Sequence, residues 1–156
     1  MNKLNYPTWL VPLDIAKELK EIGFDEPCLF VYHEVFDEEM IFISFEGDDY
    51  CYYYAELSIC SQRTNSEMGK DILEVGKHYS YACSLPTWEQ VFSWFRERGL
   101  HCSIRYLICP VTYSFHIIDN CNWDKGCGNR DTYEEAREAC VEELIKIFKE
   151  NKDRLK

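Results

Sequence analysis

The segment Leu85–Gly99, LPTWEQVFSWFRERG, is the best starting point for predicting the fold, because the start, the buried face and the end of one helix can be predicted from it. Thr87 and Gln90 have the spacing of a capping box, in which each side chain bonds the other residue's backbone N–H. Gly99 suits the left-handed position that ends a helix. Large apolar side chains at helical spacing predict its buried stripe: Trp88, Val91, Phe92 and Phe95, with Trp94 at its edge.

The other periodic segments lie on both sides of this helix. Before it, the pattern predicts a helix over 12–22, strands over 29–33, 40–45 and 50–60, and a long loop over 61–84 with a short strand at 78–83. After it, the pattern predicts strands over 101–108 and 111–118, a polar loop over 120–131, and a helix over 132–151 that starts with a second capping box. This order, α-β-β-β-α-β-β-α, indicates an α+β fold in which three helices accompany an antiparallel sheet.

The length of 156 residues fits a single domain, 1–156, with the segments 1–60 and 85–151 as αβββ and αββα halves. A chain of this length buries roughly 70% of the surface that its unfolded form exposes. Hydrophobic residues make up 46% of the chain, which excludes a disordered protein. The sequence contains no run of about 18 apolar residues, so we expect no membrane-spanning helix.

The net charge of -11 is concentrated in the first half of the chain. Between Glu21 and Gln62 there are 11 acidic residues and no Lys or Arg. Such a surface repels nucleic-acid phosphates and attracts basic partners. The second half invites comparison with the double-stranded RNA-binding domain, but that module needs three strands and a basic start to its last helix. Here that start reads Thr132-Tyr133-Glu134-Glu135, so we expect no direct binding of duplex nucleic acid.

The segment 46–54 is the candidate partner-binding surface. Alternation over 50–60 places three tyrosines on one face of the expected strand, next to acidic residues of the preceding turn. Tyrosine is enriched in protein interfaces, and it also stacks on bases. The alternative is that a helix of the same domain covers this face. The residues concerned are Glu46, Asp48, Asp49, Tyr50, Tyr52 and Tyr54.

The chain has nine cysteines, and their number is odd. The first residues, MNKLNYPTWLVP, lack the apolar run of a signal peptide, so we expect a cytoplasmic protein with reduced thiols. No C-x-x-C pair is present, and the only metal cluster worth testing is Cys121, Cys127 and His116. We therefore expect no metal and no cofactor.

No motif of a known catalytic class is present, so the chain is expected not to be an enzyme and to have no catalytic residues. Two alternatives stay open. One is sequestration of a small nucleotide-like ligand by the tyrosines, aided by Arg63, Lys70 or Arg105. The other is a cysteine-dependent enzyme that uses Cys109 or Cys127. Its base would be His116 or His78.

Three segments carry a resemblance: IAKELKEIGFDEPC (Ile15–Cys28), LPTWEQVFSWFRERGL (Leu85–Leu100) and the final-helix segment TYEEAREACVEELI (Thr132–Ile145). Together they resemble a family of small uncharacterised proteins encoded by phages, prophages and mobile elements of gut bacteria. The resemblance covers about half of the chain and brings no assigned activity. It implies a setting in which accessory proteins bind host components, including defence proteins. The sequence thus predicts a non-enzymatic protein that docks a basic host protein, as an inhibitor or in an anti-defence role. An open edge strand would allow two copies to pair as a homodimer.

Overall fold

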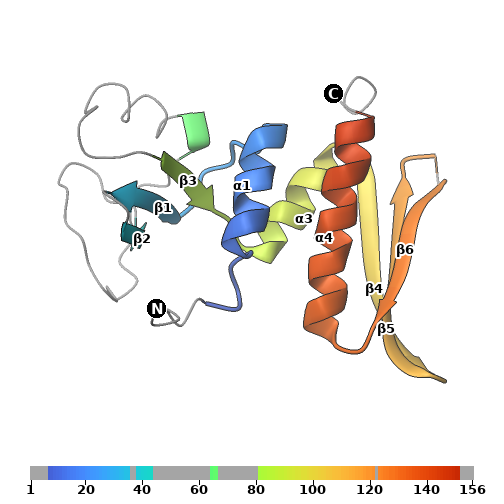
Figure 1. Ribbon diagram of the computed structural model, residues 1–156. Coiled ribbons are helices and arrows are strands. Elements are labelled where there is room, and N and C mark those ends of the chain that lie inside the picture. Colours follow the sequence, from blue (N-terminus) through green and yellow to red (C-terminus); the bar gives the residue numbers. More distant parts are fainter. Residues whose placement is uncertain (1–6, 36–37, 44–63, 67–80, 122, 152–156) are drawn as a thin grey trace. The chain divides into compact units, whose positions relative to one another are not determined.

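The computed structural model describes residues 7–35, 38–43, 64–66, 81–121 and 123–151 (Figure 1). The chain divides into two compact units, residues 1–87 and 88–156, and each is described by itself. We call them the first and the second unit. The prediction of a single domain stays a prediction.

In the first unit, helix α1 (Leu13–Ile22) begins after Pro12, one residue later than predicted. It ends at Gly23, whose φ of 98° is the left-handed conformation that glycine adopts without strain. Its buried residues are the predicted ones: Ile15, Ala16, Leu19 and Ile22. This face packs against strand β3 (Tyr81–Leu85), and the Lys20 ammonium donates to the Ala82 carbonyl over 2.6 Å.

The first unit holds a three-stranded antiparallel sheet in the order β2-β1-β3. Strand β1 (Phe30–Val35) pairs with β2 (Glu38–Ile43) on one side and with β3 on the other, with Phe30 opposite Ile43 and opposite Leu85. The predicted strands at 29–33 and 40–45 correspond to β1 and β2, and the short strand predicted at 78–83 corresponds to β3. The strand predicted at 50–60 lies outside the described residues.

A buried asparagine ties two segments of the first unit together. The Asn65 amide nitrogen donates to the Phe24 carbonyl over 2.7 Å, and its amide oxygen accepts from the Ser84 backbone N–H over 3.0 Å. Next to it, the backbone N–H of Ser66 donates to the Asp25 carboxylate over 2.7 Å. The side chain of Asn65 therefore connects the end of α1 to strand β3, a role that the loop predicted at 61–84 did not suggest.

The second unit consists of α3 (Trp88–Glu97), β4 (Leu100–Ile108), β5 (Val111–Asp119), β6 (Asp124–Arg130) and α4 (Tyr133–Glu150). The strands form an antiparallel sheet in the order β4-β5-β6. Helix α4 packs against all three strands, and α3 packs against β4 and α4 (Figure 1). The predicted inner face of α4 is confirmed, since Ala136, Cys140, Leu144, Ile147 and Phe148 are all buried.

The buried face of α3 differs from the predicted one at two positions. Trp88, Val91 and Phe95 are buried as expected, but Trp94 is buried with them and Phe92 is only half-buried. The Trp94 ring lies 5.1 Å from the Phe148 ring of α4. Because α3 packs against α4 through this aromatic contact, its buried face includes Trp94 in place of Phe92.

The α+β fold class with antiparallel strands is confirmed. The strands form two sheets where one was expected, and β6 occupies the segment for which a polar loop was predicted, so that prediction was wrong. Gly126 and Gly128 make β6 a poor strand by propensity, and for this reason its pattern was missed. Among the described segments, none of the helices has the length and apolar character of a membrane span.

Candidate functional site

The hairpin of β4 and β5 extends past the rest of the second unit. Strand β6 ends at Arg130, which lies opposite Tyr113, and α4 begins three residues later at Tyr133. The last two cross-strand pairs of the hairpin, Leu107 with Thr112 and Ile108 with Val111, lie beyond this point. Within the described residues, neither a third strand nor a helix accompanies them (Figure 1).

Apolar side chains gather on one face of this hairpin end. Phe115 and Ile117 are buried on the side of the sheet that α4 covers, and side chains two residues apart on a strand share a face. The same face therefore continues past α4 through the remaining strand positions and the first residue of α4. We call this set the hairpin-end patch: Tyr106, Ile108, Val111, Tyr113 and Tyr133.

Four of the five residues of the hairpin-end patch are exposed although they are largely apolar, and Tyr113 is half-buried. Ile108 is 75% exposed, Val111 64% and Tyr106 54%. Aromatic contacts hold its tyrosines in a row: Tyr106 and Tyr113 have ring centroids 5.3 Å apart, and Tyr113 and Tyr133 have theirs 6.1 Å apart. A clustered set of large apolar groups on a surface marks a site of protein–protein contact more often than scattered ones do.

The start of α4 fixes the position of Tyr133. Thr132 Oγ1 accepts from the Glu135 backbone N–H, and a Glu135 carboxylate oxygen accepts from the Thr132 backbone N–H, both over 3.2 Å. This capping box confirms the predicted one. The Arg137 guanidinium lies 4.2 Å from the centroid of the Trp88 ring of α3 and 5.7 Å from that of Tyr133. The patch is thus joined to the helices through defined contacts.

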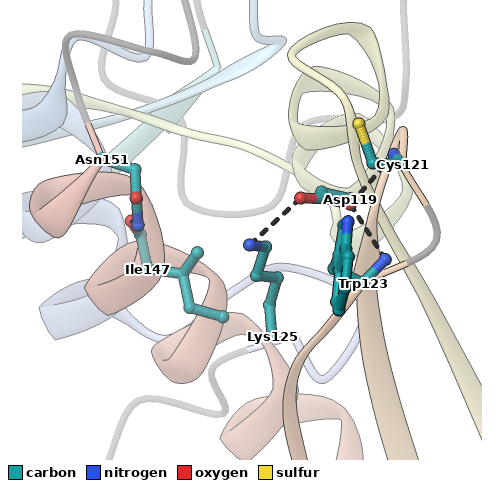
Figure 2. Close-up of polar contacts among 6 residues, drawn as sticks. All are labelled: Asp119, Cys121, Trp123, Lys125, Ile147 and Asn151. Atoms are coloured by element: carbon teal, nitrogen blue, oxygen red, sulfur yellow. Dashed lines mark hydrogen bonds and ion pairs between the residues drawn. The ribbon is translucent and has the colours of Figure 1, made fainter.

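The opposite end of the sheet carries another exposed aromatic residue, Trp123, which is 69% exposed. Asp119 organises the loop before it (Figure 2). One carboxylate oxygen accepts from the backbone N–H groups of Cys121 and Trp123 over 2.9 and 3.0 Å, and the other lies 3.1 Å from the Lys125 ammonium. These bonds, the Trp123 one foremost, hold the pKa of Asp119 below its usual range.

We expect Asp119→Asn to lower the thermal midpoint in a pH-dependent way. A carboxylate whose folded-state pKa is depressed stabilises the fold above its unfolded-state pKa, and this contribution is lost as the pH falls through the folded-state value. The midpoint difference between wild type and variant should therefore be largest near about pH 6 and shrink toward about pH 2. The control is Asp124→Asn, an exposed acid on β6. A difference that is constant with pH would contradict the prediction.

The partner-binding residues predicted from the sequence, Glu46, Asp48, Asp49, Tyr50, Tyr52 and Tyr54, lie outside the described residues. The same holds for Arg63, Lys70 and His78. Arg105 lies on β4 and is exposed, opposite Ser114 in the ladder, so it points away from the face that carries the hairpin-end patch. The structure therefore leaves the nucleotide-binding alternative without a described site.

The predicted cysteine residues are partly brought together. Cys127 on β6 lies directly opposite His116 on β5, so the two side chains share a face of the sheet. His116 Nε2 also lies 3.3 Å from Ser114 Oγ. No group of three metal-binding side chains occurs in the part of the chain that the structure describes, so Cys121, Cys127 and His116 do not form the cluster considered from the sequence. Cys109 is exposed in the turn between β4 and β5.

The hairpin-end patch was not predicted from the sequence. Tyr106, Ile108 and Val111 have the composition of ordinary half-buried strand residues. The sequence carried no signal for it, because β6 was itself predicted as a loop. In the structure, β4 and β5 have nine residues each and β6 has seven, so part of the hairpin has no third strand beside it among the described residues. Comparisons of the chain with protein-family models, with curated proteins and with solved structures gave no match.

Proposed function

We propose that this chain is a non-enzymatic binding protein that docks a partner protein through the hairpin-end patch. The observation that carries the proposal is the exposure of Ile108, Val111 and Tyr106 together at one end of a well-packed sheet. Hydrophobic and aromatic groups that project from a rigid element lose little conformational entropy on binding, which favours affinity. Tyrosines at such a position provide large contact areas together with a hydroxyl for hydrogen bonding.

The chemistry of the partner follows from the charge of the chain. A protein with a net charge of -11 attracts basic surfaces at long range and repels nucleic-acid phosphates. With β6, the second unit has three consecutive strands, as the double-stranded RNA-binding domain does. The first turn of α4, however, carries the exposed acids Glu134 and Glu135, which repel phosphates. The proposed partner is therefore a protein with an apolar contact region next to basic residues, and not a duplex nucleic acid.

The acidic segment that contains Glu46, Asp48, Asp49 and the three tyrosines completes the proposal on sequence grounds. It would attract the basic part of the partner, while the hairpin-end patch supplies the apolar contact. The resemblance to proteins of phages and prophages gives the setting, in which the partner is a host protein in the cytoplasm and binding inhibits it or counters a defence system.

In the experiment, the tagged wild-type chain is used to capture its partner from a lysate of the host. The affinity of that partner for the wild type and for each variant is then measured. The double variant Ile108→Asp/Val111→Asp should bind that partner at least about tenfold more weakly, because it places charges in the apolar contact. Both side chains are largely exposed, so the cost to stability should be limited to that of two like charges on paired strand positions, about 1 kcal/mol. Circular dichroism and thermal unfolding verify that the variant is folded.

The matched control is Trp123→Ser. Trp123 is an exposed apolar residue at the other end of the same sheet, and Asp119 bonds its backbone N–H, which the substitution keeps. This variant should bind like the wild type. In the same assay, Glu46→Gln/Asp48→Asn/Asp49→Asn should weaken binding and reduce its salt dependence. A wild-type chain that recovers no partner above the tag alone, or a partner kept by the hairpin variant, contradicts the proposal. Unchanged binding by the acidic-segment variant rejects that segment's part in it.

A further inference from the structure

Two cysteines of the second unit meet between the sheet and α4. Cys102 lies on β4 opposite Ile117, which is buried, so its side chain is on the face that α4 covers. Cys140 lies in the middle of α4 and is fully buried. Helix α4 packs against β4, and the interaction with the other thiol is the largest influence on the pKa of each of the two cysteines. Both cysteines are free thiols.

The surroundings of the two sulfurs differ. Cys102 is half-buried and has the Arg96 guanidinium of α3 near it, with Glu89 of the same helix as an opposing charge. The interaction with Cys140 lowers the pKa of Cys102 most, burial opposes this shift, and the attraction of Arg96 adds to it. The interaction with Cys102 and burial both raise the pKa of Cys140. Cys102 is thus the better nucleophile of the two, and Cys140 keeps its proton.

The first unit offers a comparison. Cys28 and Cys83 are both buried, and burial raises the pKa of Cys28 to about 12 and that of Cys83 to about 11. The thiolate is the form that reacts with oxidants, so both should stay reduced while the fold is intact. An accessible thiol with a lowered pKa next to a second thiol distinguishes the pair in the second unit.

We propose that Cys102 and Cys140 form an oxidation site, in which a hydroperoxide converts the two thiols to an intramolecular disulfide between β4 and α4. The geometry that supports it is the placement of both side chains in the interface between β4 and α4, with Cys102 partly exposed to solvent and Cys140 buried. The proposal is independent of the proposed function and uses none of the residues of the hairpin-end patch.

The reaction balances in two steps. The Cys102 thiolate attacks one oxygen of hydrogen peroxide, the O–O bond breaks, and the departing hydroxide takes up the proton that Cys102 released, which leaves a sulfenic acid and one water. The Cys140 sulfur then attacks the Cys102 sulfur, the S–S bond forms and the S–O bond breaks. The departing hydroxide takes the Cys140 proton and leaves as a second water. The two thiols lose two electrons, and the peroxide gains them.

The test treats the full-length chain with hydrogen peroxide, blocks the remaining thiols with N-ethylmaleimide after unfolding, and maps the peptides by mass spectrometry. We expect the mass to fall by about 2 Da before blocking, and a peptide pair linked through Cys102 and Cys140 that takes up no label. Cys102→Ser should abolish the linked pair. Cys127→Ser, which removes an exposed cysteine of the same sheet, should leave it unchanged.

A second variant keeps the test decisive if the disulfide itself escapes detection. In Cys140→Ala the resolving thiol is missing, so the sulfenic acid at Cys102 should accumulate and react with dimedone. The proposal is overturned if Cys102 and Cys140 are recovered as labelled thiols while Cys109, Cys121 or Cys127 is oxidised. It is also overturned if Cys140→Ala gives no dimedone adduct at Cys102.

Discussion

Trp94→Ala is expected to lower the free energy of unfolding by about 3–5 kcal/mol, the cost of truncating a large aromatic side chain in a well-packed core. Trp94 is 2% exposed. Its ring lies 4.9 Å from that of Phe95 and 5.1 Å from that of Phe148, and the Arg98 guanidinium lies 3.8 Å from its centroid. Removal of the ring therefore leaves a cavity between α3 and α4 and exposes a cation–π partner.

The measurement is urea unfolding followed by circular dichroism. Phe92→Ala on the same helix is the matched control, because Phe92 is an aromatic residue of similar helix position but is only half-buried. It should cost clearly less, about 1 kcal/mol. If Phe92→Ala proves as destabilising as Trp94→Ala, the buried face of α3 is the one predicted from the sequence and not the one in the structure.

Asn65→Ala is expected to lower the free energy of unfolding by about 2–4 kcal/mol. The variant removes one hydrogen bond to the Phe24 carbonyl and one from the Ser84 backbone N–H. Both bonds are buried, and each backbone group left without a partner away from water costs about 1–3 kcal/mol. The free energy of unfolding is again measured by urea unfolding. Hydrogen exchange of the backbone amides of β3 then shows whether the first unit opens more easily in the variant.

The neighbouring residue provides the control for Asn65. Ser66 is exposed, and its contact with Asp25 uses the backbone N–H, so Ser66→Ala keeps that bond and should change stability by less than about 0.5 kcal/mol. Asn65→Asp retains an acceptor for Ser84 but loses the donor to Phe24 and buries a charge, so it should be at least as destabilising as alanine. A stable Asn65→Ala variant would show that the side chain does not fasten 64–66 to the sheet.

Local signals determined much of the fold. Pro12, Gly23, Gly99 and the Thr132 capping box fix helix ends through interactions within a few residues, and the structure places those ends within one or two residues of the predictions. The strands of the β4–β5 hairpin were predicted equally well, because alternation and the turn at Cys109-Pro110 are local too. Outside the described residues, the acidic segment 46–54 stays a prediction.

Strand β6 shows where local signals were insufficient. A side chain at Gly128 would bring its Cβ to 2.7 Å from Phe115 Cε1, and one at Gly126 would bring it to 2.9 Å from Glu143 Cγ of α4. A larger residue at either position would require the Phe115 ring or the Glu143 side chain to shift, because both pack closely against the strand. The same glycines weaken the strand pattern in the sequence. Residues that allow close tertiary packing therefore led to the prediction of a loop.

The sequence by itself determined the fold class, the ends of its helices and the excess of negative charge, since each of these depends on residues close together in the chain or on composition alone. Only the tertiary structure decided that Trp94 replaces Phe92 in the core, that Asn65 bridges two backbone segments, that Cys102 and Cys140 share the interface of β4 and α4, and that no other described segment covers the hairpin-end patch. The reason is the same in all four cases. The contacts of a side chain depend on segments that are distant in sequence, and a local sequence pattern does not predict these contacts.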